Sequence, residues 1–252
     1  MTTFGRLDVG SRAAAVRAAV DALVRVQDGA HSTSVTLPVF YPSGAAVMVE
    51  VSGSTSGYRV SDVGLAHREV DLIGADHLFR KNAKAVVELF GLECADRSIW
   101  TNATMATLPA AIADVGAASA QIAHRIVERV ASRNEAVIEA ELYQRLVRLF
   151  GEPKVSKGVE ISGASSHRWQ ISALVTTGSR NVIFEAVANH HSSVYSAATM
   201  FHDISLLDSR PVAVAVVKDK KEMGDYLSIL SQAANVIQDN APDNAIQHLV
   251  AA

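Results

Sequence analysis

The chain has 252 residues, of which 49% are hydrophobic and 19% are charged, and its formal net charge is −3. This composition excludes a disordered chain, and the length allows two domains that each bury a core. The small negative charge argues against broad, sequence-independent DNA binding, which relies on clustered Lys and Arg to neutralise phosphates.

No apolar run in the sequence reaches the roughly 18 residues needed to span a bilayer. The first residues lack an apolar signal core, and the single cysteine, Cys94, cannot form an internal disulfide. We therefore expect a cytoplasmic protein with no membrane partner.

The first part of the chain, residues 1–105, is expected to form an α+β domain. Ala, Val and Leu recur at helical spacing over residues 11–26, which predicts an amphipathic helix. Three strand-like runs separated by Gly- and Ser-rich turns predict a small antiparallel sheet at 34–41, 46–51 and 58–61. Asp62 follows at a position typical of a helix cap, ahead of helices expected at 63–73 and 75–90.

The middle of the chain is expected to link two domains. A short strand is predicted near 98–102, and residues 108–131 carry Ala, Ile and Val at intervals of three and four. This spacing predicts one long helix, and residues 106–133 are interpreted as a connecting helix. A separate helix is expected at 135–150, because Gly151 and Pro153 follow it as a stop signal.

The last part of the chain, residues 134–252, shows strand and helix patterns in a regular order. Strands are expected at 155–162, 169–176, 182–188 and 212–217, and helices at 193–207 and 223–238. The run from Pro211 to Val217 is almost wholly apolar, as in a strand covered on both faces. The order αβββαβ therefore predicts an α/β domain with a mixed sheet.

Two strand motifs in this domain carry a resemblance to a known superfamily. With Trp169-Gln170-Ile171 on the second strand and Phe184-Glu185-Ala186-Val187 on the third, the domain resembles the restriction-endonuclease-like fold of PD-(D/E)xK nucleases. In those nucleases an Asp and an acid-x-Lys on these strands, often with a helical Glu, hold Mg²⁺ and activate water. The resemblance puts Glu185 at the acid, Gln170 in place of the Asp and Val187 in place of the Lys.

The remaining parts of such a site have to come from other elements. Glu139 or Glu141 could supply the helical acid, and Lys157 or Lys218 could replace the missing Lys. The candidate catalytic residues implied by the resemblance are Glu185, Gln170 and Lys218, and the candidate Mg²⁺ ligands are Glu185 and Glu139.

A second resemblance lies in the first half of the chain, at Val60-Ser61-Asp62-Val63-Gly64-Leu65. It is similar to prokaryotic domains of unknown function in which a strand ends in a Ser/Thr-Asp-x-Gly turn that leads into a helix. Those domains are commonly paired with a C-terminal partner domain in bacteria and their mobile elements.

Together the two resemblances imply a non-catalytic binding protein of bacterial or mobile-element origin. Its degenerate nuclease fold would bind a protein or a specific nucleic acid, in a defence, counter-defence or toxin–antitoxin system, without a cofactor. The alternative is a Mg²⁺-dependent endonuclease that uses Glu185 with a displaced Lys. The apolar positions of the helices expected at 108–131 and 223–238 could also bury a homodimer interface.

Overall fold

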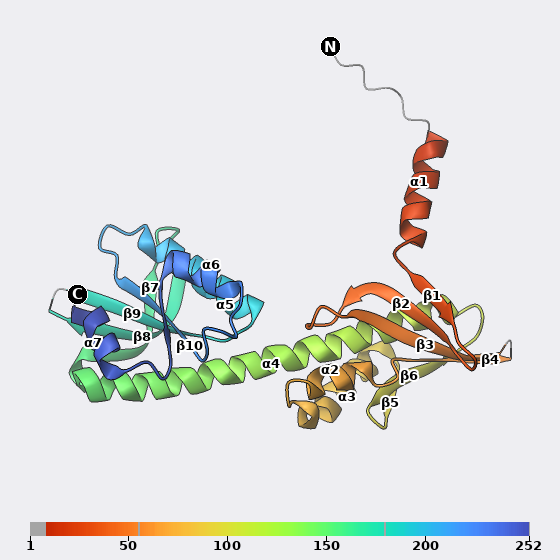
Figure 1. Cartoon of the computed structure of the whole chain (residues 1–252), viewed down its shortest axis with the longest axis horizontal. Helices are drawn as coiled ribbons and strands as arrows, with labels where there is room; N and C mark the ends of the chain where they lie inside the picture. The colour runs from red at the N-terminus through yellow and green to blue at the C-terminus, as the bar shows by residue number, and fades with distance from the viewer. Residues whose placement is uncertain (1–8, 55, 179, 252) are drawn as a thin grey trace, which may run out of the picture. The chain divides into compact units, whose positions relative to one another are not determined.

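Two sheets, one antiparallel and one mixed, organise the chain (Figure 1). The computed structural model describes residues 9–54, 56–178 and 180–251. The chain divides into two compact units, Met1–Val127 and Glu128–Ala252. The antiparallel sheet has six strands and belongs to the first unit, and the mixed sheet has five strands and belongs to the second. The protein is therefore of the α+β class.

The sheet of the first unit has the strand order β1-β2-β3-β4-β6-β5. It has more strands than the sequence predicted, because β1 and β5 were not predicted. Both strands are exposed along their whole length, so they lack the alternation of apolar and polar residues that would have indicated them. The elements of this unit before its last helix are α1 (Val9–Asp21), β1 (Arg25–Asp28), β2 (Thr33–Phe40), β3 (Ala46–Ser54), β4 (Gly57–Ser61), α2 (Leu65–Asp71), η1 (Asp76–Leu78), α3 (Phe79–Phe90), β5 (Glu93–Ala95) and β6 (Ser98–Ala103).

The helix α4 (Leu108–Phe150) begins in the first unit and ends in the second. Two separate helices were predicted over this range, and that prediction is wrong. The residues between them, Ser132, Arg133 and Asn134, include neither Gly nor Pro, so they lower helix propensity without breaking the helix.

The apolar side chains of α4 before residue 128 pack into the core of the first unit. Gly116 lies against the side chain of Leu37, where a Cβ atom would collide with it. These side chains are therefore used within the chain, and they are not free for a homodimer interface. The buried ones are Ala111, Val115, Ala118, Ala120, Ile122, Ala123 and Ile126.

Asp62 is a fully buried acid that ties the first unit together. Its Oδ1 atom accepts the N–H groups of Gly64 and Ile99, at 3.0 and 2.9 Å. Its Oδ2 atom accepts the N–H of Ala66 at 3.2 Å and the hydroxyl of Ser119 at 3.1 Å. Burial raises the pKa of Asp62, and these hydrogen bonds oppose the rise. Because Ala66 is in the first turn of α2, the carboxylate accepts a free N–H at the start of this helix. The expected N-cap at Asp62 is wrong by two residues, since α2 begins at Leu65 and its N-cap residue is Gly64.

The sheet of the second unit has the order β11-β10-β9-β8-β7. The first three strands in the sequence pair antiparallel, and β9, β10 and β11 pair in parallel. The elements after α4 are η2 (Glu152–Lys154), β7 (Val155–Ser162), β8 (Arg168–Thr177), β9 (Arg180–Val187), α5 (His191–Ser205), β10 (Val212–Val217), α6 (Tyr226–Ala233), β11 (Asn235–Gln238) and α7 (Asp243–Ala251).

The prediction of a single helix at 223–238 is wrong. Helix α6 ends at Ala233, and Asn235–Gln238 is the strand β11, which pairs with β10. Tyr226 and Ile229 of α6 pack against the core of this unit, so this part of the suggested dimer surface is also used within the chain. All four residues of β11 pair with residues of β10, and this pairing outweighs the helical periodicity of their side chains.

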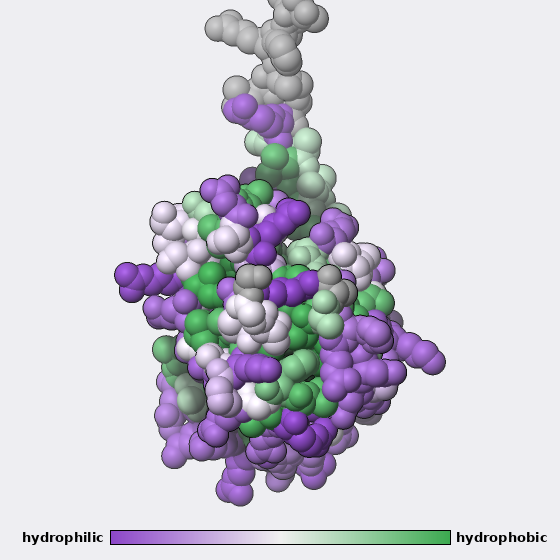
Figure 2. Space-filling model, turned by 90° about the vertical axis from the view of Figure 1, so that its left-hand side faces the viewer, coloured by the Kyte–Doolittle hydropathy of each residue, from purple (hydrophilic) through white to green (hydrophobic). Residues whose placement is uncertain are grey.

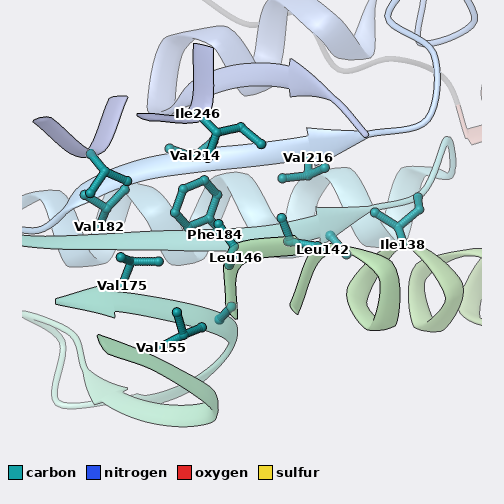
Figure 3. Packing of buried hydrophobic residues seen from close by; sticks show 13 residues of the cluster. Ile138, Leu142, Leu146, Val155, Val175, Val182, Phe184, Val214, Val216 and Ile246 are labelled. Carbon is teal, nitrogen blue, oxygen red and sulfur yellow. The ribbon is translucent and has the colours of Figure 1, made fainter. Parts of the chain in front are cut away.

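Both faces of this sheet are covered by helices. One core contains Phe184 of β9, which packs among Leu146 of α4, Ile246 of α7 and the sheet residues Val175 and Val214 (Figure 3). The other core lies on the opposite face, beneath α5 and α6. The prediction that β10 is buried on both faces is confirmed, because its last four residues are all buried.

The surface in Figure 2 has hydrophilic side chains at its borders and a hydrophobic area near its centre. Over the part of the chain that the structure describes, no helix is both long and apolar enough to cross a membrane.

Candidate functional site

The strands β8 and β9 are paired over only part of their length. Their antiparallel ladder runs from the pair Thr177 and Arg180 to the pair Ala173 and Phe184. Beyond that point β8 continues along β7, and β9 continues along β10. The two strands therefore diverge and leave a fork in the sheet.

Ser172 lies where β8 leaves β9. Ala173 is the last residue of β8 that pairs with β9, through Phe184. Along β7 the pairing of β8 has the same register before and after Ser172, because Ala173 pairs with Lys157 and Ile171 pairs with Val159. The fork is therefore a loss of pairing on one side of β8 only.

A cavity of about 650 Å³ opens in the fork, and this volume is in the range of sites that hold small ligands or the anchoring side chains of partner proteins. We call it the fork cleft. It is lined by β8, β9, the first turns of α5 and the part of α4 in the second unit. Its main polar side chains are those of Glu128, Glu135, His167, Arg168, Gln170, Glu185 and Ser193.

At the narrow end of the fork, the Glu185 side chain of β9 forms hydrogen bonds with Ser172 of β8. Its Oε2 atom accepts both the backbone N–H of Ser172, at 2.8 Å, and the Ser172 hydroxyl, at 2.9 Å. The same hydroxyl oxygen accepts the N–H of Ala186 at 3.2 Å. We call these three bonds the Glu185–Ser172 clasp. They give the N–H groups of Ser172 and Ala186 acceptors beyond the end of the ladder between β8 and β9.

The ionisation of Glu185 is shifted towards neutral pH. Burial raises the pKa of Glu185 to about 7, and the two hydrogen bonds from Ser172 only partly oppose this rise. The negative charges of Glu135 and Glu139 raise the pKa further. The cleft thus holds several carboxyl groups near one another with little compensating charge.

Glu135 is a cleft residue that sequence reasoning missed. Its Oε1 atom accepts the N–H of Ala188 at 3.4 Å, and the Ser193 hydroxyl accepts the same N–H at 3.0 Å. The prediction of a helix break before Glu135 obscured the signal. In one continuous helix, Glu135 and Glu139 are four residues apart and lie on the same side.

The two helical acids proposed from the sequence lie elsewhere. Glu139 forms an ion pair with Lys157 of β7, at 3.3 Å, and does not line the fork cleft. Glu141 lines a different cavity, of about 390 Å³, together with Arg145 and residues of β10 and β11. Glu139 therefore acts on Glu185 through its charge, and Glu141 belongs to another part of the unit.

The structure also places the other candidates from the sequence. Gln170 and Glu185 both line the fork cleft. Val187 is fully buried in the core beneath α5 and α6. Lys218 follows β10 and is exposed, and no lysine is among the described residues that line the cleft.

The cleft side chains are a poor fit to Mg²⁺. This ion prefers several oxygen ligands, usually anionic, around a near-octahedral site. Here one Glu185 oxygen already accepts two hydrogen bonds, Gln170 is neutral, and Glu139 is paired with Lys157. Within the described ranges, no three His, Cys, Asp or Glu side chains are grouped so that they could hold a metal ion.

Asp203 of α5 anchors the hairpin between β7 and β8 beside the cleft. Its carboxylate accepts the indole N–H of Trp169 at 2.7 Å. It also accepts the backbone N–H and the hydroxyl of Ser165, at 2.8 and 2.7 Å. The Trp169 and Ser165 hydrogen bonds lower the pKa of Asp203. Gly163 passes so close that a Cβ atom there would collide with the carboxylate.

We expect Asp203→Ala to release this hairpin, because three donors lose their acceptor. Hydrogen exchange of the Ser165 amide should become faster, and the paired strands β9 and β10 should keep their protection. Ser205→Ala is the matched control, since that hydroxyl bonds only to the His202 carbonyl of its own helix. Unchanged exchange at Ser165 in the Asp203 variant would show that the anchor is unimportant.

No protein-family model and no curated protein matches this sequence.

Proposed function

We propose that the second unit is a degenerate PD-(D/E)xK nuclease fold whose fork cleft binds a partner protein and does not cut nucleic acid. The order of its elements supports this proposal. Helix α4 precedes the antiparallel strands β7, β8 and β9, and helix α5 connects β9 to the parallel strand β10. Helices on both faces of this mixed sheet are consistent with the same architecture.

The hydrogen bonds that Glu185 accepts are the main observation in favour of a cleft without nuclease activity. A carboxylate that holds a metal must direct free lone pairs at the ion. The Oε2 atom of Glu185 instead accepts the backbone N–H and the hydroxyl of Ser172. Neutral Gln170 and apolar Val187 replace the second acid and the Lys of the nuclease pattern, so charge stabilisation during phosphodiester cleavage is lost as well.

The charge of the cleft favours a protein over a nucleic acid as the partner. Glu128, Glu135 and Glu185 line it, and Arg168, which also lines it, forms an ion pair with Glu160 of β7 at 3.9 Å. Phosphate groups bind where Lys and Arg release condensed counterions, and an acidic cleft opposes that binding. A protein can instead fill a cleft of this volume with an anchoring side chain that donates hydrogen bonds.

A cleavage assay tests the proposal. The full chain is incubated with supercoiled plasmid, single-stranded DNA and RNA in Mg²⁺ or Mn²⁺, beside the Glu185→Gln variant. We expect both proteins to leave all three substrates intact. Cleavage by the parent that is lost in Glu185→Gln would identify a nuclease and overturn the proposal.

A binding assay separates the two kinds of partner. We expect a labelled DNA duplex to show no change in fluorescence anisotropy with the protein at physiological salt. Tight binding that Arg168→Ala weakens would indicate a nucleic-acid partner, because Arg168 is an arginine that lines the cleft.

A further inference from the structure

Helix α1 is an uncovered element of the first unit. Every residue from Arg12 to Asp28 is exposed, so none of the side chains that the structure describes in α1 is buried by another element. The helix has 13 residues. Isolated helices shorter than about 12–15 residues are marginal in water, even when they are rich in Ala. A packing partner would therefore stabilise α1.

The larger apolar side chains of this segment form one stripe. Val16, Val20 and Leu23 are 58%, 55% and 57% exposed. The N–H of Leu23 donates to the Val20 carbonyl at 3.0 Å, so Leu23 lies in the turn that ends the helix. Together with Ala13, these residues follow one another at intervals of three, four and three. This is the spacing of a coiled-coil seam, and it places all four within about 80° of the helix circumference.

We propose that α1 pairs with α1 of a second copy of this chain in an antiparallel two-helix interface. A two-fold axis through the middle of the stripe places Val16 opposite Val20 of the partner subunit. The same axis places Ala13 opposite Leu23 of the partner subunit, so a small side chain meets a large one at each end. The stripe is thus complementary to itself, as an interface with two-fold symmetry requires.

The charges beside the stripe favour the antiparallel orientation. In a parallel pair, Arg12 and Arg17 occupy the g and e positions of the seam, so two Arg–Arg pairs would face each other and repel. In an antiparallel pair, Arg17 lies within one helical turn of Asp21 of the partner subunit, on the same side of the seam. That side then carries two Arg17 and two Asp21 side chains with no net charge, and the two Arg12 side chains lie at opposite ends.

The size of this surface predicts a weak dimer. Two helices of 13 residues bury less than the roughly 1,200 Å² at which specific, stable interfaces begin. We therefore expect a dissociation constant on the order of 10 µM, with monomer and dimer in exchange. Because an isolated α1 is marginally stable, its helical structure should become firmer as the dimer forms.

Sedimentation equilibrium of the full chain, from about 1 to 300 µM, tests the proposal. We expect a reversible equilibrium between monomer and dimer. Val20→Glu should raise the dissociation constant at least about tenfold, because each dimer loses two apolar contacts. Ala18→Glu is the matched control, since it adds the same charge on the side of α1 away from the stripe and should have a much smaller effect. A chain that stays monomeric, or a dimer that Val20→Glu leaves unchanged, overturns the proposal.

A charge reversal tests the orientation. Arg17→Glu should weaken an antiparallel dimer, because the new carboxylate lies near Asp21 of the partner subunit. The double variant Arg17→Glu with Asp21→Arg should restore the association. In a parallel dimer Arg17→Glu would instead remove the repulsion from Arg12, so tighter association of this variant contradicts the antiparallel arrangement.

Hydrogen exchange shows whether α1 itself forms the interface. Protection of the amides of Val16 to Val20 should increase with protein concentration in the parent and not in Val20→Glu. The amides of β3, in the middle of the sheet, should keep their protection in both proteins, which shows that the variant is folded. Protection of α1 that appears only with phosphatidylserine vesicles, in a chain that stays monomeric in solution, would indicate a membrane surface as the partner and overturn the proposal.

Discussion

Replacement of Asp62 by alanine is expected to unfold the first unit or to leave it barely folded. The carboxylate is fully buried and accepts hydrogen bonds from Gly64, Ala66, Ile99 and Ser119. These donors come from the start of α2, from β6 and from α4, so one side chain connects three elements that are distant in sequence. Alanine removes the acceptor for all of them at once.

The expected cost is large compared with the stability of a domain. Each buried donor left without an acceptor costs about 1–3 kcal/mol, so the loss should be at least about 4 kcal/mol. Folded domains are stable by only about 5–15 kcal/mol. Urea denaturation followed by hydrogen exchange of β6 measures the effect, and the strands of the second unit provide an internal reference.

Two further variants make the interpretation specific. Asp62→Asn keeps one acceptor oxygen and should be intermediate. Ser61→Ala removes a neighbouring hydroxyl that bonds to the Ile99 carbonyl and accepts the Val63 N–H, and its cost should be about 1 kcal/mol. If Asp62→Ala were as mild as Ser61→Ala, the assigned role of the buried carboxylate would be wrong.

The second large effect is expected at Arg145, which holds the C-terminal segment. Its Nε atom donates to Asp243 at 2.7 Å, and its Nη1 atom donates to the Asp239 carbonyl at 2.6 Å. Its Nη2 atom donates to the Ala241 carbonyl and pairs with Asp243. The guanidinium thus fixes the turn between β11 and α7. Ile246 of α7 packs into the core of the second unit.

Arg145→Ala should cost about 2–3 kcal/mol, since hydrogen bonds that involve a charged group are worth more than neutral ones. Exchange of the α7 amides should increase more than exchange of β9. Arg148→Ala is the matched control. Arg148 is 69% exposed and lies 3.7 Å from the same Asp243 carboxylate, so its loss should cost about 0–1 kcal/mol. Equal effects of the two variants would contradict the role given to Arg145.

Much of the second unit could be predicted because its strands carry strong local signals. The run Val212–Val217 is apolar throughout, and the structure buries it on both faces of the sheet. The turn at Gly163–His167 also follows from the preferences of single residues. These features depend on residues close together in sequence, which is why a pattern can predict them.

The fork and its chemistry could not be predicted in the same way. The fork arises because β8 stays paired with β7 beyond Ala173 while its pairing with β9 ends there, and nothing in the side-chain pattern around Ser172 indicates this loss of pairing. Glu135 enters the cleft because α4 continues past Asn134, where a break was predicted. Strand β11 forms only because β10 is available as its partner. Each of these depends on tertiary pairing, which overrides local preference.

Some of the candidate site residues could be placed correctly from the sequence, and others could not. Glu185 and Gln170 lie in one cleft because they are on neighbouring strands, and strand order follows from the element pattern. The exposed Lys218 does not reach that cleft, because it comes after the last residue of β10. A sequence pattern predicts which strands are neighbours in a sheet more easily than it predicts which cleft a side chain in a loop can reach.

Titration with Mn²⁺ tests the central claim most directly, namely that the Glu185 carboxyl group accepts hydrogen bonds from Ser172 and does not hold a catalytic metal. Electron paramagnetic resonance measures free Mn²⁺ in the presence of the parent chain and of Glu185→Gln. We predict the same free Mn²⁺ with both proteins, because Glu185 accepts its hydrogen bonds from Ser172. Stoichiometric binding by the parent that is lost in Glu185→Gln would contradict the account and indicate a nuclease-like metal site.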